Sequence, residues 1–184
     1  MLKKIVSVLP FVLLASCQKD TMPKPIGELR LEYPKAEYRK FEGPCHFNFE
    51  YSKYAEVQEG KQPCWFYLTY PEMKAKVFIT YIPVQGDIMA HIKEAERMVY
   101  KHTIKANAIE TKSFEYPKRK VYGNFYELKG QTASNIQVYA TDSTRHFLTA
   151  NLYFNSRPKP DSLAPAVEYI KKDLMHMLDT FEWK

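Results

Sequence analysis

Four segments in series decide the fold of this chain: ETKSFEY (residues 110–116), KVYGNFYEL (120–128), NIQVYAT (135–141) and RHFLTANLYF (145–154). All four are rich in aromatic and β-branched residues, which favour strands. The short stretches between them contain Pro117, Gly130 and Asp142, and residues of these types mark turns. The series therefore predicts four consecutive strands of an antiparallel sheet.

Helical patterns precede and follow this series. The first begins after Asp87, a suitable N-cap, and the second covers residues 162–181, with Ser162 as N-cap and Pro165 in the first turn. Apolar side chains recur every three or four residues in both, as in amphipathic helices. The two stripes are Ile88, Ile92, Ala95, Val99, His102 and Ala106, and Leu163, Val167, Ile170, Leu174, Met177, Leu178 and Phe181. Further strand signals occupy residues 45–51, 64–70 and 74–82. We expect an α+β fold, a mostly antiparallel sheet covered by two amphipathic helices.

The composition fits one globular domain. Of the 184 residues, 45% are hydrophobic and 26% are charged, which excludes a disordered tail, a collagen-like repeat and a helical coiled coil. The formal net charge is +6, but basic residues are scattered among acidic ones and form no arginine-rich arm. We therefore expect no nucleic-acid partner and interpret the positive charge as solvated surface. Attraction to anionic lipid headgroups is the alternative.

The first 17 residues indicate export followed by lipid attachment. Lys3 and Lys4 form a basic n-region, and residues 5–15 form an apolar stretch too short to span a bilayer as a helix. The following LASC (residues 14–17) matches the lipobox of bacterial lipoproteins, in which the cysteine thiol carries a diacylglycerol before cleavage. Residues 1–16 are thus the predicted signal peptide and Cys17 the predicted lipidation site, anchored firmly once it carries two or three acyl chains. The alternative is an ordinary signal peptide with a coincidental cysteine.

The residues after the anchor predict a tether and a single domain. Residues 17–40 contain Pro23 and Pro25, which favour an extended path, and residues 41–184 carry the sheet and helix patterns. We expect four apolar residues of the tether to pack along the domain: Leu29, Leu31, Tyr33 and Tyr38. Gln18 occupies the position at which an Asp retains many lipoproteins in the inner membrane, so we expect the outer membrane.

Two cysteines remain once Cys17 carries lipid. Cys45 and Cys64 each follow a proline, and both are expected in an oxidising compartment, where paired cysteines form disulfides. We predict a structural Cys45–Cys64 disulfide. A redox dithiol and a metal site that adds His46 are the alternatives, although a C-x-x-C motif and a fourth ligand at a zinc-motif spacing are both missing from the sequence.

No catalytic or cofactor-binding motif occurs in the sequence. It contains no nucleophile elbow, no phosphate-binding glycine loop and no dinucleotide fingerprint. His91 and His102 lie too far apart on one predicted helix to share a metal. We therefore predict no catalytic, cofactor or metal-binding residues and a protein that is not an enzyme.

Aromatic residues are unusually dense in the predicted strands. They are Trp65, Phe66, Tyr67, Tyr70, Tyr122, Phe125, Tyr126, Phe147, Tyr153 and Phe154. Alternation along a strand places one set in the core and leaves the other outside. The outer set is either incidental surface or an interface, because tyrosine and tryptophan are enriched at binding hot spots.

Taken together, ordered segments along essentially the whole chain resemble the gliding motility lipoprotein GldD family of the Bacteroidota. These segments are the signal with its lipobox, PKPIG (residues 23–27), residues 30–38, the Pro44-Cys45 and Pro63-Cys64 pairs, Ile79-Thr80-Tyr81 and LDTF (178–181). The resemblance implies a role in gliding over surfaces, through machinery that overlaps with type IX protein secretion. It carries over no catalytic residues. The element order is also similar to the PsbP/Mog1-type fold, a scaffold used in binding and assembly.

These observations predict a membrane-anchored, non-enzymatic accessory or assembly component of the gliding motility or type IX secretion machinery. Its expected partners are proteins of the cell envelope. The alternative is a periplasmic binding module for a small hydrophobic or peptide ligand. A sizeable unfilled apolar pocket between sheet and helices would favour the alternative, and a solid core with an exposed aromatic patch would favour the assembly role.

Overall fold

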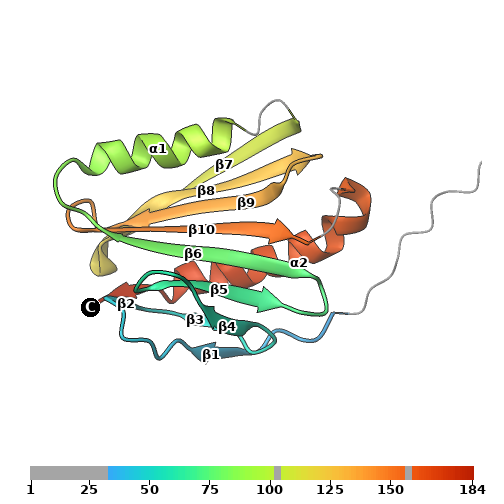
Figure 1. Ribbon diagram of the computed structural model, residues 1–184, viewed down its shortest axis with the longest axis horizontal. Helices are drawn as coiled ribbons and strands as arrows, with labels where there is room; N and C mark the ends of the chain where they lie inside the picture. The colour runs from blue at the N-terminus through green and yellow to red at the C-terminus, as the bar shows by residue number, and fades with distance from the viewer. Residues whose placement is uncertain (1–32, 102–104, 156–158) are drawn as a thin grey trace, which may run out of the picture.

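A seven-stranded antiparallel sheet forms the centre of the computed structural model, which describes residues 33–101, 105–155 and 159–184 (Figure 1). Its strand order is β4-β5-β6-β10-β9-β8-β7. The bounds are β4 Glu56–Glu59, β5 Trp65–Tyr70, β6 Ala75–Pro83, β7 Ala106–Tyr116, β8 Val121–Gly130, β9 Ser134–Thr141 and β10 His146–Phe154. Two small sheets pair β1 (Tyr38–Lys40) with β3 (Glu50–Ser52) and β2 (Phe47–Asn48) with β11 (Glu182–Trp183).

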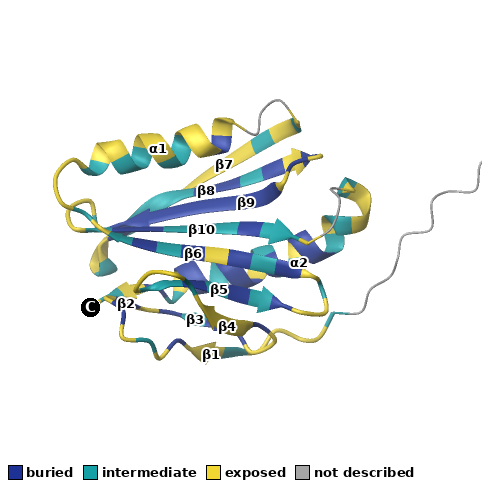
Figure 2. Cartoon of the chain, in the orientation of Figure 1, coloured by how far each residue is buried: buried dark blue, intermediate teal, exposed yellow. Residues whose placement is uncertain are grey.

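The two helices, α1 (Ile88–Tyr100) and α2 (Pro160–Asp179), cover opposite faces of the large sheet (Figure 1). Strand alternation gives the reason, since neighbouring residues point to opposite faces. On β9, Tyr139 packs in the cluster that contains α1, whereas Val138 packs in the cluster that contains α2. All eight residues of β9 are buried, which marks it as a central strand with both faces covered (Figure 2).

The α2 side holds the main core. Ile170, Leu174 and Met177 of α2 are at most 1% exposed and belong to the same buried cluster as Leu148 and Leu152 of β10. The small sheets extend this core with stacked phenylalanine rings. Phe47 lies on β2, Phe41, Phe49 and Phe181 lie next to the small-sheet strands, and these rings stack with one another and with Phe66 of β5.

The expected α+β class and the four consecutive strands are confirmed. Asp87 caps α1 as predicted, because its side chain accepts a hydrogen bond from the Met89 N–H at 2.8 Å. The predicted end of this helix is wrong: α1 ends at Tyr100, and Ala106 is the first residue of β7, where it pairs with Gly130. His102 lies outside the described residues.

The second helix also begins earlier than predicted. α2 starts at Pro160 with Lys159 at its N-cap, so Ser162 lies inside the helix. A proline suits the first helical position because its φ is already helical and it has no N–H to satisfy. The predicted strand over residues 45–51 is divided into β2 and β3, with Phe49 between them.

The described end of the tether packs on α2, as expected for Tyr33 and Tyr38. The Tyr33 ring stacks on Tyr169 at 5.0 Å between centroids, and the Tyr38 ring stacks on His176 at 3.6 Å. Leu29 and Leu31 lie outside the described residues. The last residues of the predicted tether therefore pack as part of the folded domain.

Candidate functional site

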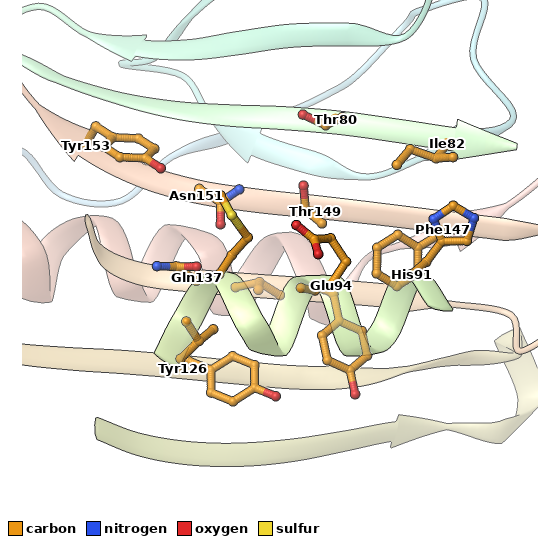
Figure 3. A pocket seen from close by; sticks show the side chains of 15 residues that line it. Thr80, Ile82, His91, Glu94, Tyr126, Gln137, Phe147, Thr149, Asn151 and Tyr153 are labelled. Carbon is orange, nitrogen blue, oxygen red and sulfur yellow. The ribbon is translucent and has the colours of Figure 1, made fainter. Parts of the chain in front are cut away.

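Helix α1 covers only part of its face of the sheet. It packs on Tyr126 of β8, Tyr139 of β9 and Phe147 of β10. On β6, Phe78 points to the same face and stays 36% exposed. Between α1 and the sheet lies a cavity of about 250 Å³, which we call the α1 groove (Figure 3). It is lined by Thr80, Ile82, His91, Glu94, Ala95, Met98, Val99, Tyr126, Gln137, Val138, Tyr139, Phe147, Thr149, Asn151 and Tyr153.

The floor of the α1 groove consists of neutral polar side chains from three neighbouring strands. Gln137 of β9 is paired with Asn151 of β10, and Thr149 of β10 is paired with Thr80 of β6. Among the described residues, these four side chains have no hydrogen-bond partner. Gln137 is 5% exposed, and its buried Nε2 is an unsatisfied donor. A buried donor left unpaired costs about 1–3 kcal/mol of stability, so this amide destabilises the folded protein.

The walls of the groove supply aromatic rings and neutral hydroxyls. Burial raises the pKa of Tyr126 and Tyr153, and it raises the pKa of Tyr139 to about 12. These phenols therefore stay protonated at physiological pH and act as hydrogen-bond donors. Phe147 adds an apolar ring, with the His91 ring 5.6 Å from it between centroids.

The carboxylate at the mouth of the groove is already neutralised. Arg97 donates hydrogen bonds to both oxygens of Glu94 at 2.6 and 2.7 Å. These bonds lower the pKa of Glu94, so it stays ionised and paired. The described residues that line the groove include no lysine or arginine. The groove thus presents hydrogen-bonding groups with little net charge.

An aromatic row continues from the groove across the uncovered part of the sheet. Tyr67 of β5, Phe78 of β6 and Tyr153 of β10 make edge-to-face contacts, with centroid distances of 4.7 and 5.1 Å. We call these three residues the aromatic row. The dense aromatic residues of the predicted strands divide into two sets. Phe66, Tyr70, Phe125, Tyr126 and Phe147 are buried, whereas Tyr67 and Tyr153 are only partly buried.

A wider basin of about 840 Å³ lies beside the C-terminal end of α2, and several of its polar groups already hold parts of the fold together. Arg119 donates to the carbonyl oxygens of Asp179 and Phe181 at 2.7 and 2.8 Å, and Tyr116 donates to the Asp179 carboxylate. These contacts tie the end of α2 to the short helix at Pro117–Arg119. Because Arg119 and Asp179 at its centre serve the fold, this basin is a weaker candidate than the α1 groove.

The structure describes the two predicted disulfide cysteines but not the predicted lipidation site. Cys45 and Cys64 form a disulfide with a Cα–Cα distance of 5.6 Å, which joins the segment before β2 to the start of β5. Cys17 lies outside the described residues. Within the described ranges, no group of three or more metal-ligating side chains comes together.

No pattern in the sequence indicated Gln137 or Asn151 as site residues. Alternation in NIQVYAT already places Gln137 on the same face as Tyr139, and an amide within a strand that is buried along its length is the available signal. Its pairing with Asn151 depends on the register of β9 and β10. The sequence does not give that register directly.

No helix among the described residues has the length and apolar character needed to cross a bilayer.

Comparisons with known proteins identify the family of the chain. No curated protein matches the chain. The family model of the gliding motility lipoprotein GldD matches residues 18–183. Since the match begins directly after Cys17 and extends into β11, the chain belongs to the gliding motility lipoprotein GldD family.

Proposed function

We propose that this protein is a non-enzymatic accessory or assembly component of the gliding motility and type IX secretion machinery. Membership of the family supports involvement in gliding motility and a lipid-anchored association with the cell envelope. The proposal adds attachment through acyl chains on Cys17 and location in the outer membrane, for which Gln18 is the sequence argument. Its partners are envelope proteins of the same machinery.

The aromatic row is the observation that carries this proposal. Phe78 lies at its centre, 36% exposed, between Tyr67 and Tyr153. Large aromatic side chains held on a rigid sheet lose little conformational entropy on binding and form the typical hot spots of protein interfaces. We therefore assign the aromatic row as the contact surface for an envelope protein.

The alternative function fits the structure less well. A binding module for a small hydrophobic ligand needs a sizeable apolar pocket. The α1 groove measures about 250 Å³ and has an amide and hydroxyl floor, and the larger cavity of about 590 Å³ beside the start of α2 is lined by the charged Arg39, Lys53 and Glu72 as well as by apolar side chains. The core between α2 and the sheet is filled by side chains such as Leu148 and Leu174. We further propose that the fold is of the PsbP/Mog1 type, whose use in assembly agrees with an accessory role but does not establish it.

Complementation of a deletion strain tests the proposed function. Phe78→Ala and Tyr67→Ala, alone and combined, should reduce gliding and secretion at normal protein abundance, because each removes a hot-spot ring worth about 2 kcal/mol or more of partner binding. Val57→Ala is the matched control, since Val57 is 37% exposed and lies on β4 outside the aromatic row. Full motility and secretion in the combined variant would contradict the proposal. A histidine or carboxylate variant that abolishes function at normal abundance would revive an enzymatic role.

A further inference from the structure

The α1 groove holds hydrogen-bonding capacity that the fold does not use. The amides of Gln137 and Asn151 and the hydroxyls of Thr80 and Thr149 have no partners within the described part of the chain. They come from three adjacent strands, and Figure 3 shows Thr80, Thr149 and Asn151 beside helix α1. Buried polar groups are normally paired, and the Nε2 of Gln137 is an unpaired buried donor on a residue that lines this groove, which points to a ligand.

The chemistry of the lining limits the ligand class. An anionic ligand would need a cation, and there is no lysine or arginine among the lining residues that the structure describes. A fatty acyl chain would leave the amide and hydroxyl floor unsatisfied. The one carboxylate at the mouth, Glu94, is paired with Arg97. The lining therefore suits an uncharged ligand that both donates and accepts several hydrogen bonds and also has an apolar face.

A sugar ring has these properties. Its hydroxyls donate and accept, as a planar Asn or Gln amide does, and its C–H face packs on aromatic rings such as Phe147 and Tyr153. An acetamido substituent adds a carbonyl oxygen, the acceptor that the Nε2 donor of Gln137 lacks. We propose that the α1 groove binds a neutral saccharide that carries an acetamido group, with this carbonyl on Gln137.

The size of the groove fits one ring with a chain continuing outside it. Its volume of about 250 Å³ lies below the range of about 300–1,000 Å³ that is usual for drug-sized ligands. Further rings would lie outside the groove. This inference goes beyond the proposed function and does not depend on it.

Titration with defined oligosaccharides tests the inference. The full chain is purified in a polyoxyethylene detergent, which has no sugar headgroup, and titrated with chitotriose and maltotriose, with binding measured by calorimetry. We expect chitotriose to bind at least about tenfold more tightly than maltotriose, a difference of about 1.4 kcal/mol. Equal binding of the two sugars would overturn the inference. So would the absence of chitotriose binding at a sugar concentration of about 10 mM, because a Kd above this value is too weak for a functional site.

Gln137→Leu separates a binding role from a structural one. The substitution removes an unpaired buried amide, so the melting temperature should stay the same or rise while chitotriose affinity falls at least about tenfold. Asn135→Leu is the matched control on β9, because the Asn135 amide donates to the Leu128 carbonyl and to Thr132. It should lower the melting temperature and leave chitotriose affinity unchanged. Unchanged affinity in Gln137→Leu would contradict the inference.

Thr149→Val provides a second variant if Gln137→Leu fails to fold. It removes one floor hydroxyl with little change of shape and should weaken chitotriose binding about two- to fivefold, because a single hydrogen bond is lost. None of these variants changes the aromatic row. Loss of sugar binding with normal gliding would leave the proposed function intact, and the converse result would leave the sugar site intact.

Discussion

Asp173→Asn should stabilise this protein at neutral pH. Asp173 lies on the buried side of α2 and is 3% exposed. Tyr70 donates a hydrogen bond to its Oδ2 at 3.1 Å, but within the described residues its Oδ1 has no partner. Burial raises the pKa of Asp173, and the neighbouring hydroxyls of Ser52, Tyr70 and Tyr38 only partly oppose this effect. The ionised carboxylate is therefore a cost to the fold.

The sign of the pH dependence follows from this raised pKa. The folded protein holds the Asp173 proton to higher pH than the unfolded chain, so the free energy of unfolding falls as pH rises from the ordinary value of 3.8 through the folded pKa. Asparagine keeps the acceptor for Tyr70 and adds an N–H₂ that can reach Ser52. Since a buried charged group with an unmet hydrogen bond costs about 1–3 kcal/mol, the variant should gain about this amount at pH 7.

Urea unfolding of the full chain in mild detergent at several pH values measures the effect. The advantage of Asp173→Asn should shrink as pH falls and disappear below about pH 4, where both native and unfolded states of the parent protein are protonated. Glu168→Gln is the control on the same helix, because Glu168 is exposed and its ion pairs with lysine contribute little. A variant that is less stable than the parent protein at pH 7 would refute the argument.

Three further predictions concern a turn, the disulfide and the anchor. Asp142 accepts backbone N–H bonds from residues 144–146, which overcome the opposing effect of burial and lower its pKa to about 2. Asp142→Ala should therefore cost about 1–3 kcal/mol at pH 7 and less as pH falls from 3.8 toward 2 in urea unfolding; a cost that grows in acid would contradict it. Cys45→Ser should lower stability by about 3 kcal/mol, because the Cys45–Cys64 disulfide closes a loop of 19 residues, and free thiols in protein isolated without reductant would exclude the bond. Cys17→Ser should abolish labelling by a palmitate analogue, and equal labelling of the variant would refute lipidation at Cys17.

The strands were predictable because their signals are local. Each of the segments over residues 110–154 alternates or clusters aromatic residues between clear turns, and every one forms a strand of the sheet. The helix ends were less predictable, since the apolar spacing of α1 continues to Ala106 although the chain there pairs with Gly130. At Ala106, pairing with the neighbouring strand therefore prevailed over the helical spacing of apolar residues.

The candidate site was less predictable than the fold, because it depends on contacts between distant segments. Gln137 meets Asn151 only through the register of β9 on β10. The burial of Asp173 was weakly indicated by the sequence, since Asp173 lies three residues after Ile170 and four before Met177, within the apolar stripe of α2. A charged residue at such a position marks a buried polar contact, but Tyr70, its partner, lies 103 residues away.

Helix dimensions explain why one face of the sheet stays open. A helix is about 10 Å wide and strands are about 4.8 Å apart, so a single helix covers about two strands. On the α2 face, the phenylalanine rings of the small sheets, including Phe47 and Phe49, cover the strands that the helix leaves bare. On the other face the described chain provides α1 alone over seven strands. The side chains that α1 leaves uncovered include the partly exposed aromatic row, and the groove beside it has a floor of amides and hydroxyls. Both proposed binding surfaces thus arise from the same incomplete coverage, and a partner seated on this face would complete the layer that the fold lacks.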